Sequence, residues 1–116
     1  MRDLAEQLAG ILAVAAAVLH GVLGETKVFA RARIEPEWVR RLIRLVWQWG
    51  TIACVSLAIL LIAAPRLRSD AARNWIIATS IVTFGFGAVA NAWATRGQHF
   101  GWVVLTIVVG LAAIGL

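Results

Sequence analysis

Charged residues are scarce in this sequence, and their absence is concentrated in four long stretches. No Asp, Glu, Lys or Arg occurs in residues 7–24, 45–65, 74–95 or 97–116. Each stretch has about 20 residues, the length of helix that crosses a hydrocarbon core of about 30 Å. With 61% hydrophobic residues, the chain also lacks the polar surface of a soluble domain. We therefore predict an all-α fold, an integral membrane four-helix transmembrane bundle that forms one domain over residues 1–116.

Residues that end helices or carry catalysis are few. Gly24, Pro65 and the pair Arg96-Gly97 mark the expected ends of three helices. The single cysteine, Cys54, excludes an internal disulfide. No nucleophile has a base and an orienting group at a credible spacing, so an enzyme is the least supported class. Ser56 and Ser80 lie deep and are expected to be packing residues or to bond to the backbone of their own helix. The expected helices cover about residues 4–24, 36–64, 70–95 and 98–116.

Basic residues outnumber acidic ones and give a net charge of +5. They flank the apolar stretches, a position typical of contacts with anionic lipid headgroups and not with nucleic acid. Alternating helix direction places seven of them on one side of the membrane and Arg2, Arg66, Arg68 and Arg73 on the other. The positive-inside rule then favours both termini outside the cytoplasm. The seven are Lys27, Arg31, Arg33, Arg40, Arg41, Arg44 and Arg96, of which Arg40, Arg41 and Arg44 are the expected headgroup contacts.

Polar side chains within the spans gather at the depth of this basic side. Alternating helix direction places His20, Gln48, Asn91 and His99, one from each expected helix, within roughly 10 Å of depth. An unpaired polar group in hydrocarbon carries a large free-energy cost, so these groups must pair, reach water or hold a ligand. We predict a polar pocket near the basic-side leaflet. Its expected ligand-binding residues are His20, Glu25, Trp47, Gln48, Asn91, His99 and Trp102.

Helical phase predicts which side chains face the interior of the bundle. In membranes, small residues face neighbouring helices and large aliphatic residues face lipid. By this rule His20, Asn91 and His99 face inward. The expected inward neighbours are Ala13 and Ala17 for His20, Ser80, Phe84 and Ala88 for Asn91, and Thr106 and Gly110 for His99. The expected lipid-facing residues are Val82, Phe86, Val89 and Trp93 in the third helix, and Val104 and Val108 in the fourth.

Several functions fit such a pocket, and the pattern does not choose among its ligands. His20 and His99, with Glu25 as the nearest acid, are suitable ligands for a transition metal or a haem iron. Tryptophans beside them favour a flat ligand such as haem or a quinone. Hydrogen bonding that only fixes helix register explains the same residues. We expect first a protein that binds a small ligand without catalysis.

Two alternatives come from other features. Small-residue ladders favour an accessory or assembly subunit of a larger membrane complex, because they allow close contact between helices. They are Ala9, Ala13, Ala17 and Gly21, and Gly50, Cys54 and Ala58. A small proton-coupled transporter acting as a homodimer would instead use His20, Glu25 and Arg44 as its titrating path.

Three short motifs resemble those of a set of small, uncharacterised four-helix membrane proteins of bacteria. They are His20-Gly-Val-Leu-Gly-Glu25, Trp47-Gln-Trp49 and Arg96-Gly-Gln-His99-Phe-Gly-Trp102. The resemblance spans most of the chain, implies a bacterial cytoplasmic membrane and supports the importance of His20, Glu25 and His99. In that set a histidine often stands at the position of Gln48, so the resemblance implies that a three-histidine site is altered here. It implies no activity.

A reporter enzyme that is active only in the cytoplasm tests the predicted orientation. Fused to the C-terminus, it is expected to give no signal, because seven basic residues hold the opposite side in the cytoplasm. The same reporter inserted between Lys27 and Arg33 is expected to be active. A strong signal from the C-terminal fusion would reverse the orientation.

Overall fold

The computed structural model describes residues 1–116, which form four α-helices and no strands. Three helices are long: α1 (Arg2–Leu23), α2 (Glu37–Ala63) and α3 (Asp70–Thr95). The fourth, α4 (Gly101–Ile114), has 14 residues. A π-helical turn (Gly24–Val28) continues α1, and a 3-10 turn (Ala64–Arg66) follows α2 at Pro65. The expected all-α class is confirmed.

Three helical segments are long and apolar enough to cross a membrane. They are Arg2–Val28, Glu37–Arg66 and Asp70–Thr95, which agrees with an integral membrane protein. Helix α4 is apolar but starts later than the expected residue 98, because the chain first turns at Arg96 and Gly97. Both have a positive φ, 53° and 77°, and glycine adopts this conformation without the steric cost that a Cβ brings.

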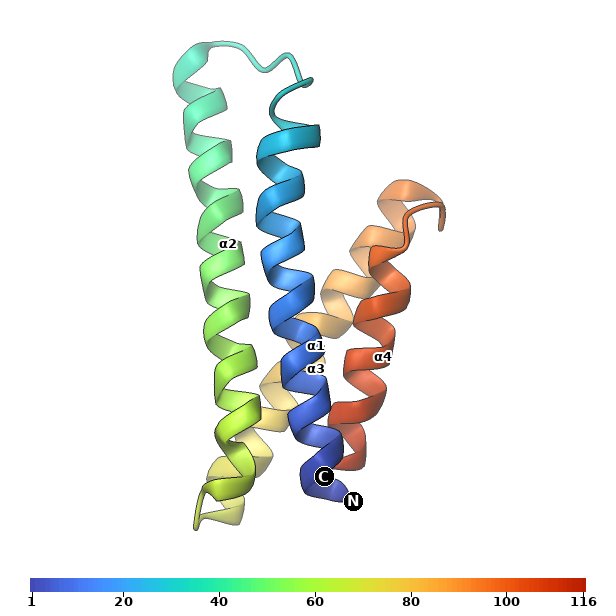
Figure 1. Ribbon diagram of the computed structural model, residues 1–116. Helices are drawn as coiled ribbons and strands as arrows, with labels where there is room; N and C mark the ends of the chain where they lie inside the picture. The colour runs from blue at the N-terminus through green and yellow to red at the C-terminus, as the bar shows by residue number, and fades with distance from the viewer.

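The helices form two antiparallel hairpins, α1–α2 and α3–α4 (Figure 1). Both termini and the connection between α2 and α3 lie at one end, here called the termini end. The α1–α2 connection and the α3–α4 turn lie toward the other, the basic end. Helix α1 packs on α2 and on α4, whereas α2 and α3 touch less extensively. The hairpins lie close together at the termini end and diverge toward the basic end (Figure 1).

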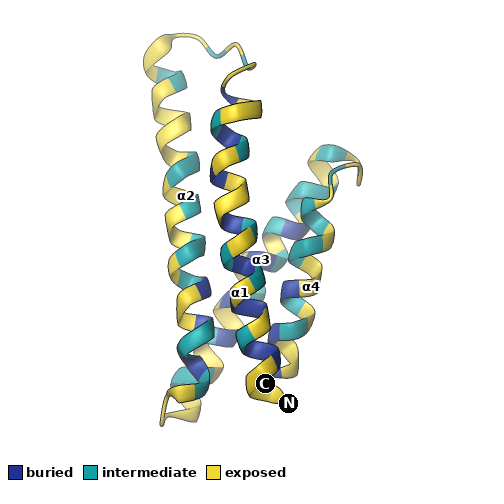
Figure 2. Ribbon diagram, in the orientation of Figure 1, coloured by how far each residue is buried: buried dark blue, intermediate teal, exposed yellow.

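The hydrophobic core lies where the two hairpins meet. Every helix contributes to it, and α1 contributes only alanines, which let the neighbouring backbones approach closely. Figure 2 shows most buried positions in the half of the molecule nearer the termini, apart from those on α1, which continue toward the basic end. The core residues are Ala9 and Ala13, Ala58 and Leu61, Ile77 and Phe84, and Val108 and Ala112.

The predicted helical phase is confirmed in α3 and partly in α1, and it is wrong in α4. Ser80, Phe84 and Ala88 are buried, and the expected lipid-facing residues of α3, Val82, Phe86, Val89 and Trp93, are 70–84% exposed. Ala13 and Ala17 are buried in α1, but His20 is exposed. In α4 the order is reversed, since Val108 is buried while Thr106 and Gly110 are exposed. Because α4 is apolar all round, its small residues did not mark the inner face.

Gly10 is the position where the backbones of α1 and α2 allow no side chain. A Cβ there would lie 2.8 Å from the Ala58 carbonyl oxygen and would also collide with Ile62. We expect Gly10→Ala to lower the free energy of unfolding by about 1–3 kcal/mol, the usual cost of overpacking.

Gly50→Ala is the matched control for this substitution. Gly50 also lies inside a helix, but a Cβ there meets nothing within 4 Å. Alanine is the better helix former by up to about 1 kcal/mol, so this variant is expected to be neutral or more stable. Unfolding in mild detergent, followed by circular dichroism, measures both. Equal stability of the two variants would contradict the α1–α2 packing.

Candidate functional site

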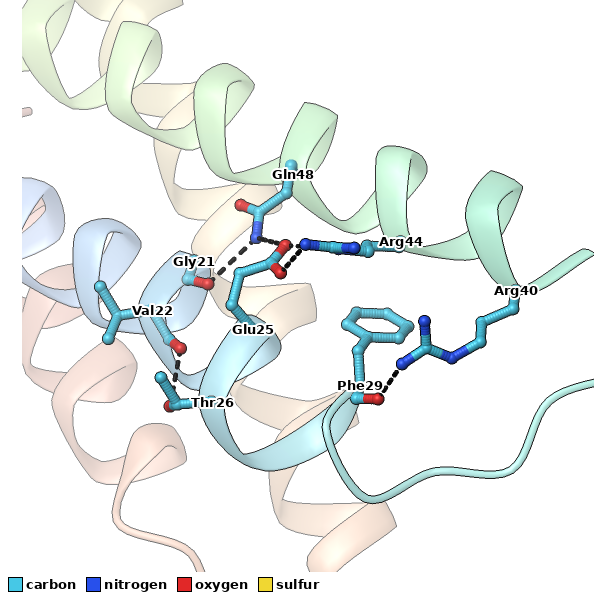
Figure 3. A network of polar contacts seen from close by, with 8 residues as sticks. All are labelled: Gly21, Val22, Glu25, Thr26, Phe29, Arg40, Arg44 and Gln48. Carbon is cyan, nitrogen blue, oxygen red and sulfur yellow. Dashed lines mark hydrogen bonds and ion pairs between the residues drawn. The ribbon is translucent and has the colours of Figure 1, made fainter. Parts of the chain in front are cut away.

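The α1–α2 cluster consists of His20, Glu25, Arg44, Trp47 and Gln48, at the basic end of the first hairpin. Figure 3 shows Glu25 directed at α2, with both carboxylate oxygens paired. Arg44 binds it through Nε, 3.0 Å from Oε1, and through Nη2, 2.5 Å from Oε2. Gln48 Nε2 donates to the same Oε1 and to the Gly21 carbonyl, each at 3.0 Å. All hydrogen-bond donors to the Glu25 carboxylate therefore come from side chains of α2.

Two glycines of the first motif make room for these contacts. A Cβ on Gly21 would lie 3.0 Å from Gln48 Oε1, and one on Gly24 would collide with the Trp47 indole. That indole donates from Nε1 to the His20 carbonyl oxygen at 3.0 Å. Its ring also stacks on the His20 imidazole, with centroids 4.2 Å apart and planes 3° from parallel. The motif from His20 to Glu25 thus positions the end of α1 against α2.

The α3–α4 cluster consists of Asn91, His99 and Trp102. Asn91 Oδ1 accepts the backbone N–H of Trp102 at 3.0 Å, which ties α3 to the first turn of α4. Trp102 Nε1 donates to the Gly97 carbonyl oxygen at 3.0 Å. His99 Nδ1 accepts the backbone N–H of Gly101 at 3.0 Å and lies 3.4 Å from Asn91 Nδ2. The second long motif therefore builds the tight turn between α3 and α4.

These contacts decide which nitrogen of His99 carries the proton. A backbone N–H and the Asn91 amide both approach Nδ1, so Nδ1 is the acceptor and Nε2 carries the hydrogen of the neutral ring. A histidine that binds a metal instead donates its second N–H to a carboxylate or carbonyl. Ligation through Nε2 would place a hydrogen on Nδ1, facing the Gly101 N–H. The surroundings of His99 do not suit a metal ligand.

The predicted residues come together in two groups and not in one pocket. No hydrogen bond or ion pair joins the α1–α2 cluster to the α3–α4 cluster. The turn that carries His99 is set apart from α1 and α2, because the hairpins diverge toward this end (Figure 1). No group of three or more His, Cys, Asp or Glu side chains could hold a metal ion. The expected trio of His20, Glu25 and His99 is therefore not assembled.

The three arginines expected at lipid headgroups differ in their partners. Arg44 pairs with Glu25, and Arg40 donates to the Phe29 carbonyl oxygen (Figure 3). Arg41 is exposed and has no hydrogen bond or ion pair within the chain. It lines an open groove of about 360 Å³ together with Glu25, Arg44, Leu45 and Gln48. Three of the five residues that line this groove, Glu25, Arg44 and Gln48, belong to the α1–α2 cluster.

The sequence reasoning missed a buried ion pair at the termini end. Glu6 is 0% exposed, and its Oε1 accepts Arg73 Nε at 2.7 Å. Arg73 Nη2 also pairs with Asp3 Oδ1 at 2.6 Å. Helical spacing could have indicated that Glu6 is buried, because it places Glu6 on the same inward face as Ala9, Ala13 and Ala17.

The deep hydroxyl groups satisfy themselves, as expected. Ser56 Oγ donates to the Ile52 carbonyl at 2.9 Å, and Ser80 Oγ donates to the Ile76 carbonyl at 2.7 Å. Each hydroxyl group therefore bonds to the carbonyl oxygen of the preceding helical turn. No protein-family model, curated protein or solved structure matches this chain.

Asn91→Ala tests whether the α3–α4 cluster holds the second hairpin. The variant leaves the Trp102 N–H without its acceptor, so the free energy of unfolding is expected to fall by about 1–3 kcal/mol. Asn74→Ala, at an exposed position in the first turns of the same helix, is the matched control and should change it little. Detergent unfolding measures both, and equal effects would show that Asn91 is not part of a stabilising cluster.

Proposed function

We propose that this chain is an integral membrane protein with four membrane-crossing helices, and that it binds an anionic phospholipid headgroup in the groove of the α1–α2 cluster. The unpaired Arg41 guanidinium carries the proposal, since Arg41 lines an open groove together with Arg44 and Gln48. Arg41 and Arg44 contribute two positive charges and Glu25 one negative charge, which leaves a net positive groove. A phosphate that carries one negative charge complements it.

The depth of the groove supports a headgroup as the ligand. Arg41 follows the start of α2, Glu37, by about one helical turn. The apolar part of α2 starts at Leu45, so Arg41 lies at the border between the expected hydrocarbon and headgroup regions. Lys27 and Arg31 are exposed on the adjoining connection and would add attraction to an anionic membrane surface.

The proposed site lies near the basic-side leaflet, where the sequence predicts a pocket, but its ligand is a phospholipid headgroup and not a metal, a haem or a quinone. A metal or haem needs the histidines of both hairpins to converge, whereas the α1–α2 cluster needs no residue of the second hairpin. A small-residue ladder as the surface for a larger complex is less favoured, because Ala9, Ala13, Ala17 and Gly21 are buried within this chain. Catalysis is not part of the proposed function.

Arg41→Gln tests the groove. Loss of the guanidinium that would bind the phosphate is expected to weaken binding by about 1.5–3 kcal/mol, the usual contribution of a hydrogen bond to a charged group, which is roughly a tenfold or larger loss of affinity. Native mass spectrometry of the purified protein with phosphatidylglycerol, and with phosphatidylcholine as the zwitterionic reference, measures this difference.

Arg33→Gln is the matched control, because Arg33 is exposed on the same side and lies outside the groove. It removes the same charge and should retain the preference for phosphatidylglycerol. An equal loss of affinity for phosphatidylglycerol in both variants would show that only the general surface charge matters. Wild-type protein without any preference for the anionic lipid would end the proposal.

A further inference from the structure

Thr83 is the one hydroxyl residue of the long helices that makes no hydrogen bond through its side chain. It is exposed on the outer face of α3. Each of the other hydroxyl groups inside the four helices donates to a carbonyl oxygen of its own helix; they belong to Thr51, Ser56, Thr79, Ser80, Thr95 and Thr106. The Thr83 hydroxyl group therefore remains available to a partner outside the chain.

The depth of Thr83 makes this free hydroxyl group costly. Tryptophan favours the two boundaries between membrane and water, and α3 has one exposed tryptophan near each end, Trp75 at 72% and Trp93 at 84%. The helix between them is about 27 Å long, close to a hydrocarbon core of about 30 Å. Thr83 lies about 12 Å along the helix from Trp75, near the middle of this core. An unpaired polar group is unfavourable there.

A hollow on the same face of α3 offers room for a neighbouring helix. Thr83 lines it together with Trp75, Ala78, Thr79 and Val82, and its volume is about 230 Å³. Small residues such as Ala78 and Thr79 let a second helix approach closely in a membrane. The free hydroxyl group and the space for a partner therefore occur at the same place.

The face is also large enough for a stable contact between proteins. Its five large side chains are 70–84% exposed and offer roughly 800 Å², about the area that each partner contributes to an interface of standard size. They belong to Trp75, Val82, Phe86, Val89 and Trp93.

The hydroxyl group also separates this face from the outer faces of the other helices. Ser56 on α2 and Thr106 on α4 are exposed too, but each is already bonded to its own backbone. Helix α1 contains no serine or threonine. Only the α3 face therefore presents an unsatisfied hydroxyl group to the hydrocarbon.

A second copy of this chain is the partner that satisfies Thr83. Acyl chains have no hydrogen-bonding atom in the middle of a bilayer. Two copies insert in the same orientation, because both follow the same distribution of basic residues. A two-fold axis along the membrane normal then brings each residue near the axis to the same residue of the other copy. One Thr83 hydroxyl group donates and the other accepts.

We propose that the outer face of α3 is a homodimer interface within the membrane, in which the Thr83 hydroxyl groups of two copies hydrogen-bond to each other. The face shares no residue with the groove of the α1–α2 cluster. The dimer therefore goes beyond the proposed function, and either proposal can fail without the other.

Energy transfer between donor-labelled and acceptor-labelled full chains in phosphatidylcholine vesicles tests the dimer. The labels are attached at the N-terminus, and dilution with lipid gives the dimerisation affinity. Wild-type protein is expected to dimerise. Thr83→Val keeps the shape of the side chain but removes the hydroxyl group, and is expected to weaken dimerisation roughly threefold to thirtyfold, the range for a hydrogen bond between helices in a membrane. Thr83→Ser restores the hydroxyl group and should restore most of the affinity.

Thr79→Val is the matched control, because Thr79 lines the same hollow but its hydroxyl group is bonded to its own helix. It should change the affinity little. Wild-type protein that stays monomeric, an unchanged affinity in Thr83→Val, or an equal loss in Thr79→Val would each overturn the proposal.

Disulfide cross-linking identifies the face and does not depend on the threonine variants. Cys54 is the single native cysteine, so Cys54→Ala provides a chain without thiols. In this background Val82→Cys, on the α3 face, is expected to form a covalent dimer on oxidation in vesicles. Ile52→Cys is the matched control, because Ile52 is also exposed within a span but lies on α2. Cross-linking at Ile52 without cross-linking at Val82 would overturn the proposal.

Discussion

Close contact of α1 with both α2 and α4 depends on a helix face that carries nothing larger than alanine except Glu6. Ala9 and Ala13 are fully buried on this face, and Gly10 lies against the backbone of α2. The contact brings the two hairpins together only at the termini end. The Glu6 side chain on this face is fully buried, so its charge has to be met by a group on another helix. Arg73 on α3 does so.

At the opposite end, polar groups are satisfied inside each hairpin. Side chains of α2 bond to the carbonyls of His20 and Gly21 and to the Glu25 carboxylate, while Asn91 and His99 organise the turn before α4. All of these hydrogen bonds lie within one hairpin or the other. The hairpins can therefore diverge at this end without breaking any of these hydrogen bonds, each of which would be costly to lose in hydrocarbon.

Hydropathy and phase predicted the all-α class, the four helices and the outer face of α3, because these depend only on local sequence. Pairing between helices depends on contacts that local sequence does not contain. The rise per residue predicted that His20 and His99 lie at a similar depth in the membrane. Two residues at the same depth can still lie on opposite sides of a bundle. Glu6 and Arg73 are 67 positions apart, and only the packing of α1 on its neighbours brings them together. In α4, an apolar surface on all sides removed the contrast that phase requires.

The unequal lengths of α2 and α4 have a consequence for a bilayer around them. Helix α2 has 27 residues and is about 40 Å long, whereas α4 has 14 residues and is about 21 Å long. Lipids beside α4 would meet a hydrophobic wall shorter than an ordinary hydrocarbon core of about 30 Å, whereas the apolar part of α2, Leu45–Ala63, is about as long as that core. Membranes adjust to such differences by thinning locally or by tilting the protein. One flank of this small protein would thus sit in a thinner membrane than the other.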